Sequence, residues 1–328
     1  MPLTKRALAA LLPLACSALM GIAPPAFAQP YPNRQVTIVV PIGPGTEVDW
    51  SARAYAPKLA DLWKVPVVVD NRVGAGGDIG IGSVAKSAPD GYTLLMTGGS
   101  FAINPAVIKS NYDPIQSFKP VMLTAISHFA FVVSSKVRAT TLADFVKEAK
   151  AAPGQFNYSS PGNGTVQHLT MELFKKEAGV SITHIPYKTA GAAISDLAGG
   201  TVDAAIVSPP QVVDLQKAGR VRILALLAPA RAEPIPAVPT VVEAGYPGAV
   251  VTGWSAMLAP AGTPADILDK LSKDMRAVRE MPEMINAFTK RSGHSDNGGG
   301  PPERLGNLIE ADFKRWKAIA AEANIKPD

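Results

Sequence analysis

The sequence predicts an α/β fold made of two lobes around a shared cleft. Short runs of β-branched residues alternate with helical stretches, as in proteins whose helices cover a largely parallel sheet. A strand, a loop of small residues and the start of a helix follow one another twice, at residues 36–56 and 156–178. Ligands of such sheets bind beyond the carboxyl ends of the strands, and domain interfaces favour pockets. We therefore expect the two loops to face one cleft.

The chain is organised around its first strand and the loop that follows it. Val36–Val40 is an unbroken β-branched run, typical of a buried strand in a parallel sheet. Residues 41–45 are rich in proline and glycine and interrupt regular structure. Thr46 is suited to cap the helix that follows. Free backbone N–H groups and the helix dipole at this turn favour an anion without any cationic side chain.

Two acidic residues complicate this first loop. Glu47 and Asp49 fall in the first turn of the predicted helix. Acids at that position stabilise the helix through its dipole. They also repel a bare anion, so we expect water or a hydrogen-bond donor to lie between them and an anionic ligand.

The other elements are predicted from hydrophobic periodicity, capping residues and turn residues. Small-residue loops are expected at residues 71–80, 98–100 and 160–165, and a proline-rich loop at 234–239. Strands are expected at residues 65–69, 92–97, 121–124, 129–134, 156–159, 182–187, 202–207, 221–227 and 254–258. Helices are expected at residues 51–62, 81–87, 142–151, 166–178, 191–198, 210–218, 265–280 and 301–321.

Residues 1–28 have the features of a secretory signal peptide, which predicts a periplasmic protein. Lys5 and Arg6 precede an apolar stretch, and an A-x-A cleavage site ends at Ala28. The single cysteine, Cys16, lies in this leader, so the exported protein would contain no disulfide. Lipoprotein processing at Cys16 is disfavoured by Pro13, which stands where leucine is preferred.

The charge balance argues against nucleic acid as a partner. The whole chain has 32 basic and 27 acidic residues, and removal of Lys5 and Arg6 leaves 30 basic residues and a net charge of +3. No cluster of basic residues is interleaved with aromatic ones. A nucleic-acid-binding surface normally shows both features.

Short motifs raise two enzymatic alternatives, and both fit poorly. Gly80-x-Gly-x-x-Ala85 matches a loose dinucleotide fingerprint, but the preceding strand ends ten residues too early and no acidic residue follows at the required distance. Ser83-Val-Ala-Lys86 has the S-x-x-K form of an exported serine acyl hydrolase. The matching S-D-N at residues 295–297 comes last rather than second, and Lys188-Thr-Ala190 is an imperfect K-T-G.

No metal, cofactor or catalytic residue is therefore predicted. The four histidines are scattered without the spacing of a metal site. Loops of glycine and proline without a positioned base indicate binding rather than catalysis. A serine hydrolase using Ser83 and Lys86 and an interaction module without a ligand remain the alternatives.

Seven segments in order give the chain a resemblance to the Bug family, the extracytoplasmic solute-binding proteins of tripartite tricarboxylate transporters. They span the sequence beyond the leader, and their number and order carry the resemblance. They are residues 31–41 (YPNRQVTIVVP), 68–80 (VVDNRVGAGGDIG), 88–95 (APDGYTLL), 165–169 (TVQHL), 184–188 (HIPYK), 238–245 (VPTVVEAG) and 258–264 (LAPAGTP).

The resemblance implies a periplasmic-binding-protein fold that closes on its ligand like a Venus flytrap, with crossing strands as the hinge. It places residues 29–130 and 250–328 in one lobe and residues 131–249 in the other. The expected ligand is a small organic acid, either a monocarboxylate or a dicarboxylate, which is held largely by backbone N–H groups and ordered water. The expected partners are membrane permease subunits or a sensor kinase, and the protein is expected to be a monomer.

From both lines of reasoning we predict a site shared by the two lobes. Members of the family usually have glycine at the positions of Thr46 and Thr189, and Glu47 adds an acid to the first loop. Because of these differences, the ligand could also be an amide, an aromatic acid or a molecule with a cationic group. The predicted ligand-binding residues are Gly43, Pro44, Gly45, Thr46, Glu47, Asp49, Ser100, Ser160, Gly162, Asn163, Gly164, Thr165, Tyr187 and Ser208.

Overall fold

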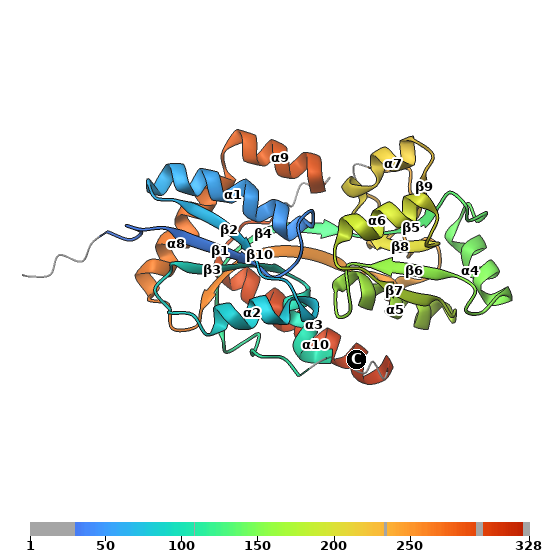
Figure 1. Cartoon of the computed structure of the whole chain (residues 1–328), viewed down its shortest axis with the longest axis horizontal. Helices are drawn as coiled ribbons and strands as arrows, with labels where there is room; N and C mark the ends of the chain where they lie inside the picture. The colour runs from blue at the N-terminus through green and yellow to red at the C-terminus, as the bar shows by residue number, and fades with distance from the viewer. Residues whose placement is uncertain (1–29, 108, 233–234, 293–297, 324–328) are drawn as a thin grey trace, which may run out of the picture.

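A computed structural model describes residues 30–107, 109–232, 235–292 and 298–323. Two five-stranded mixed sheets with helices on their faces form two lobes, which lie side by side along the long axis (Figure 1). The predicted α/β, two-lobed fold is thus confirmed. The predicted leader at residues 1–28 lies outside the described residues. In the described part of the chain, no helix has the length and apolar character needed to span a membrane.

The first sheet has the strand order β2-β1-β3-β10-β4. Residues of β1 alternate between two cores, with Val36, Ile38 and Val40 in one and Val39 in the other. Both faces of β1 are therefore buried, which explains its unbroken β-branched sequence. The strands β1 (Val36–Val40), β2 (Val67–Asn71) and β3 (Thr93–Gly98) are parallel. Strand β10 (Thr252–Pro260) runs antiparallel to both of its neighbours, β3 and β4 (Phe118–His128), so the edge strand β4 has the same direction as the first three.

Helices cover both faces of this first sheet, so the lobe has three layers (Figure 1). One core is formed with buried residues such as Tyr55, Met275 and Phe288, and the other with Phe101 and Ile309. The first face carries α1 (Glu47–Trp63), α8 (Ala265–Arg279) and α9 (Pro282–Ser292), and the second face carries α2 (Asp78–Ala85), α3 (Ser100–Val107) and α10 (Pro302–Ala323), with a 3-10 turn at Ala75–Gly77 before α2.

The second sheet has the strand order β7-β6-β8-β5-β9 and is also covered on both faces. Phe145 and Phe174 belong to the core on one face, and Leu197 and Val212 belong to the core on the other. The strands are β5 (Ala130–Ser134), β6 (Asn157–Ser160), β7 (Thr183–Pro186), β8 (Ala204–Val207) and β9 (Val221–Leu226). The helices are α4 (Leu142–Ala151), α5 (Val166–Ala178), α6 (Ala190–Gly199) and α7 (Val213–Lys217), with 3-10 turns at Pro209–Gln211 and Pro247–Ala249.

Two strands cross between the lobes side by side. β4 of the first sheet leads into β5 of the second with only Phe129 between them. The chain returns next to this crossing, because the N–H of Val251 donates to Leu227 O at 3.1 Å and the N–H of Leu227 donates to Phe129 O at 2.8 Å. Thr252 then pairs with His128 as β10 begins. The two crossings therefore form a two-stranded connection between the lobes.

Helix α10 is a further connection between the lobes. Its N-terminal half contributes Leu305 and Ile309 to a core of the first lobe. Its C-terminal half contributes Trp316 and Ala320 to the cluster that contains Phe174 of α5. Figure 1 shows α10 below the first lobe, with the C-terminal end of the helix reaching toward the second.

The sequence located most elements, but it missed two helices and misjudged a third. β1, α4 and α5 have the predicted bounds, and the cap predicted for α1 is made by the side chain of Thr46. Helices α3 and α9 were not predicted. The single helix expected at residues 210–218 is instead a 3-10 turn and the short helix α7, because Val212 between them is not helical.

Candidate functional site: a cleft between the lobes

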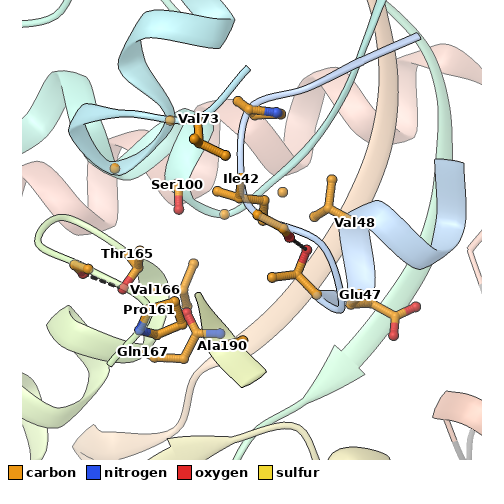
Figure 2. Close-up of a pocket in the computed structure, with 18 of the residues that line it drawn as sticks. Ile42, Glu47, Val48, Val73, Ser100, Pro161, Thr165, Val166, Gln167 and Ala190 are labelled. Atoms are coloured by element: carbon orange, nitrogen blue, oxygen red, sulfur yellow. Dashed lines mark hydrogen bonds between the residues drawn. The ribbon is translucent and has the colours of Figure 1, made fainter. Parts of the chain in front are cut away.

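A cavity of about 410 Å³ lies between the two lobes. Residues of both sheets line it, and Figure 2 shows loop residues from the two sides pointing toward one another. Apolar side chains form much of the wall, including Ile42, Val48, Val73, Phe129 and Trp254. The cavity thus has the apolar walls and few polar groups typical of a small-molecule site.

The predicted first-lobe loop is held in shape by Asp49. Its carboxylate accepts a hydrogen bond from the Gly45 N–H at 3.1 Å, and others from Arg53 Nε at 3.1 Å and Asn71 Nδ2 at 2.9 Å. Thr46 Oγ1 caps α1 by accepting from the Asp49 N–H at 3.3 Å. Burial by itself would raise the pKa of Asp49, but these hydrogen bonds outweigh burial and lower it. Asp49 is therefore an ionised anchor of the loop.

Not every predicted residue of this loop lines the cavity. Gly43, Thr46 and Glu47 do, and Glu47 extends from the start of α1 in Figure 2. Pro44 and Gly45 lie outside the wall, although Gly45 O accepts a hydrogen bond from Gln211 Nε2 of the second lobe at 2.9 Å. The glycine makes this contact with its backbone, and φ of +86° explains why glycine is required there.

The second-lobe loop repeats this construction. Thr165 caps α5, because its Oγ1 accepts from the His168 N–H at 3.4 Å and also donates to Gly162 O at 2.7 Å. Gly162, Asn163 and Thr165 line the cavity. Ser160 and Gly164 do not line it, and they instead support the loop from behind through hydrogen bonds.

The remaining predicted residues come from three further elements. Ser100, the first residue of α3, and Ser208, after β8, line the cavity together with Tyr187. The Tyr187 hydroxyl donates to Asp196 Oδ2 at 2.6 Å. Burial and this carboxylate raise the pKa of Tyr187 to about 12, so the phenol is neutral at physiological pH.

Sequence reasoning missed several lining residues. The loop 73–77 was recognised as rich in glycine but was not assigned to the site, although it follows β2, the neighbour of β1 in the sheet. The order of the strands, which the sequence did not give, decides this adjacency. The other lining residues outside the prediction are Pro41, Ile42, Val48, Thr97, Gly98, Gly99, Ser127, Phe129, Pro161, Val166, Gln167, Pro186, Lys188, Thr189, Ala190, Gln211, Gly253 and Trp254.

The N-termini of four helices converge on this cavity. The first turns of α1, α3, α5 and α6 contribute Glu47, Ser100, Val166 and Ala190 to its wall. Each start exposes N–H groups and the positive end of a helix dipole. The first turn of α1 contains two acids, whereas those of α3, α5 and α6 contain none. The electrostatic field at the second lobe and α3 therefore favours an anion.

The lobes approach each other closely around the cleft. A Cβ added at Gly76 would lie 2.8 Å from Asn163 O, and one added at Gly99 would lie 2.8 Å from Val166 Cγ2. Both contacts join an element of the first lobe to the second-lobe loop or helix α5. Glycine at these two positions allows this close approach of the lobes.

The serine hydrolase alternative does not fit the position of Ser83. Its Oγ donates to Gly80 O at 2.7 Å within α2 and accepts from Arg72 Nη1 at 3.0 Å. Neither Ser83 nor Lys86 lines the cavity. The S-D-N at residues 295–297 lies outside the described residues. Among the described residues, no group of three metal-binding side chains is present.

Two α/β lobes joined by crossing strands, with a cavity between their loops, define the class of the periplasmic solute-binding proteins. A family model described as the tripartite tricarboxylate transporter family receptor, TctC, matches residues 51–325, and the chain belongs to this family. Its members are periplasmic binding proteins and not enzymes, as the Bug resemblance implied.

Individual relatives agree with this assignment. BugT of Bordetella pertussis is 35% identical over 316 residues, covering 94% of this chain and 95% of the relative. R. palustris Rpa4515, whose structure contains adipate, has a TM-score of 0.85 and 34% identity, with 91% of this chain and all of that chain covered. MatC from Rhodopseudomonas palustris, with bound malate, has a TM-score of 0.80 and 27% identity, covering 88% of this chain and 99% of that chain.

Proposed function

We propose that this protein binds the carboxylate of a small organic acid in the cleft and delivers it to the permease of a tripartite tricarboxylate transporter or to a sensor. The observation that carries the proposal is the convergence of helix N-termini on a cavity with apolar walls. Such N-termini bind anions through backbone N–H groups. The adipate and malate in the related structures are small organic acids of this kind.

The carboxylate is proposed to lie against α3, α5 and α6 rather than α1. Asp49 already occupies the Gly45 N–H in the α1 loop, and Glu47 adds a second negative charge. The first turns of α5 and α6 are capped by Thr165 and Thr189 and contain no acid. A second polar group of the ligand, whether a carboxylate, an amide or an amine, would extend along the apolar wall toward the first lobe.

The other elements of the proposal concern movement and location. Residues 29–130 with 250–328 and residues 131–249 would move as two bodies about the crossing strands, opening and closing around the ligand. Residues 1–28 would direct export to the periplasm and be removed. The protein would act as a monomer. All fourteen residues predicted from the sequence would contribute to ligand binding. Some would contact the ligand, and others, such as Asp49 and Ser160, would hold the loops that contact it.

A thermal-shift screen of the chain from residue 29 onward tests this proposal. The panel contains adipate, malate, aromatic monocarboxylates, amino acids and amides. A ligand at about 100 times its Kd should stabilise the fold by about 2.7 kcal/mol. A folded protein that responds to none of the carboxylates would contradict the proposal.

A pair of glycine variants locates the binding. Gly162 lines the cavity and has φ of +132°, whereas Gly154 has φ of +75° and lies outside it. Gly162→Leu should abolish the stabilisation by ligand, and Gly154→Leu, which also places a side chain at a positive φ, should retain it. Equal responses of the two variants would remove the second-lobe loop from the site.

A further inference from the structure

Three aromatic rings are stacked directly behind the second-lobe loop. The ring of His184 on β7 lies between those of Tyr158 on β6 and His168 on α5. The centroid distances are 4.7 Å to Tyr158 and 4.1 Å to His168, with interplanar angles of 19° and 11°. Tyr158 is fully buried and both histidines are half-buried. The stack is therefore a rigid support for the residues that cover it.

Both histidines hold the loop by hydrogen bonds. His184 Nε2 lies 2.6 Å from Ser160 Oγ, which in turn accepts from the Gly162 N–H at 3.1 Å. His168 Nδ1 accepts a hydrogen bond from the Gly164 N–H at 3.2 Å. Gly162 lines the cavity, as does Asn163 between the two tethered glycines. The shape of the ligand-binding loop is thus coupled to the two imidazoles.

The contact at Gly164 determines where the proton of His168 lies. A backbone N–H can only donate, so Nδ1 must offer its lone pair and the imidazole must be neutral, with its proton on Nε2. A protonated imidazole carries N–H groups at both nitrogens and would turn an N–H toward the N–H of Gly164. The hydrogen bond therefore exists only in the neutral form of His168.

The charged groups near the stack belong mainly to α5 itself. Glu172 accepts from the Tyr158 hydroxyl at 2.6 Å and forms an ion pair with Lys175 Nζ at 2.6 Å. The elements packed on α5 from other directions present apolar residues to the core, namely Ala204 from β8, Ala249 from the 3-10 turn and Trp316 from α10. Glu172, a carboxylate that acts on His184, is thus already paired with an amine.

The two imidazoles differ in how their protonation responds to pH. Burial, followed by the neighbouring His168, lowers the pKa of His184 to about 4. The neutral form of His184 therefore predominates at neutral pH, where its contact with Ser160 is maintained. The pH-dependent contact that we propose belongs to the other imidazole, His168, because its Nδ1 accepts from the Gly164 N–H.

We propose that His168 is a positioning residue for ligand binding, which holds Gly164 and the loop in the binding shape only while its imidazole is neutral. This inference rests on the proposed function. Protonation of His168 would release the Gly164 N–H and loosen the loop. Protonation would therefore weaken ligand binding, and bound ligand would make His168 harder to protonate. Affinity is then highest at neutral pH and falls in acid, by at most tenfold per pH unit for one proton.

Two substitutions separate the hydrogen bond from the charge. His168→Asn places an amide oxygen near the position of Nδ1, so it retains an acceptor for Gly164 and cannot become charged. His168→Leu removes the acceptor and retains an apolar side chain. The first variant should bind as the natural protein does at neutral pH, and the second should bind more weakly at every pH.

Nuclear magnetic resonance of the ligand-free protein tests the hydrogen bond between His168 and Gly164. Between pH 5 and pH 8, the Gly164 amide resonance should titrate with the same midpoint as the His168 ring. In His168→Asn it should be constant. A proton found on Nδ1 of His168 at neutral pH, or a Gly164 amide that does not respond to titration of the ring, would overturn the proposal.

Adipate is then titrated into the same three proteins between pH 5 and pH 8. Adipate itself takes up protons at the acid end of this range, so the three proteins are compared with one another at each pH. The affinity of the natural protein should equal that of His168→Asn at neutral pH and fall below it in acid, and the affinity of His168→Leu should be low throughout. A ratio of the affinities of the natural protein and His168→Asn that does not change with pH would overturn the coupling to binding. If adipate fails to bind at any pH while Gly164 still follows His168, the proposed ligand is wrong and the support of the loop stands.

Discussion

Asp49 shows how one buried acid fixes the geometry of the first loop. It is 4% exposed and accepts hydrogen bonds from a backbone N–H, an amide and a guanidinium. Hydrogen bonds to a charged group contribute about 1.5–3 kcal/mol. We expect Asp49→Asn to reduce the free energy of unfolding at pH 7 by about 2 kcal/mol, because the amide leaves the Arg53 guanidinium without an anion and weakens the loop.

The pH dependence of this effect follows from the direction of the shift. The pKa of Asp49 is lowered in the folded protein, so its contribution is complete above the pKa of the unfolded state and disappears as pH falls through the folded value. Chemical unfolding of the natural protein and Asp49→Asn at pH 7 and pH 3 measures this. The difference should shrink in acid, and a difference as large at pH 3 as at pH 7 would contradict the assignment.

At the scale of the element, helix α5 is both a structural unit and a source of positive potential. Its first turn contains no acid and contributes Gln167 to the cavity wall. Gln167→Glu places a carboxylate there, which should stabilise the helix by about 0.3–1 kcal/mol through its dipole. The same charge should repel a bound carboxylate by about 1–4 kcal/mol, the Coulomb range between water and a protein surface.

Opposite changes in stability and affinity are therefore expected from Gln167→Glu. Gln155→Glu adds the same charge at an exposed position outside the cavity and serves as the control. Calorimetric titration with the carboxylate found in the screen, combined with thermal unfolding, measures both quantities. Unchanged affinity in Gln167→Glu would place the anion away from α5.

At the scale of the whole molecule, the closed arrangement depends on the absence of a side chain at Gly99. A Cβ there would lie 2.8 Å from Val166 Cγ2 across the cleft, and overpacking of this kind costs about 1–3 kcal/mol. Gly99→Ala should therefore favour the open form and reduce ligand affinity roughly 5- to 150-fold. Small-angle scattering should show compaction on ligand binding in the natural protein and less in the variant.

Gly191→Ala is the matched control for this change. A Cβ at Gly191 meets no atom within 4 Å, and the residue lies in α6 outside the cavity wall. It should close and bind as the natural protein does. If Gly99→Ala also behaves normally, Val166 moves aside and the approach of the two lobes does not limit closure.

The features that the sequence determined are those set by neighbouring residues. The β-branched run of β1 and the threonine that caps α1 were predictable, because strand preference and capping act within a few residues. The two loops after these strands were located for the same reason. The resemblance of seven ordered segments added the family, which the matched model confirms.

The features that the sequence did not give depend on residues distant in the chain. Helix α3 is short and contains Pro105, and it is held in place because its Phe101 is buried in a core shared with α10. The loop 73–77 joined the cavity only because β2 pairs with β1. In the same way, Asp49 and Ser160 lie behind the cavity wall, where Asp49 accepts a hydrogen bond from Asn71 of β2 and Ser160 is bonded to His184 of β7.

The sequence by itself thus determined the class of the fold, the family and the two loops that contain the helix starts. Only the tertiary structure decided which residues of these loops face the cavity, which ones support it, and that two histidines from different elements hold one loop in place. Local preference and capping act between residues close in the chain, whereas a cavity wall is set by strand order and packing between segments more than a hundred residues apart.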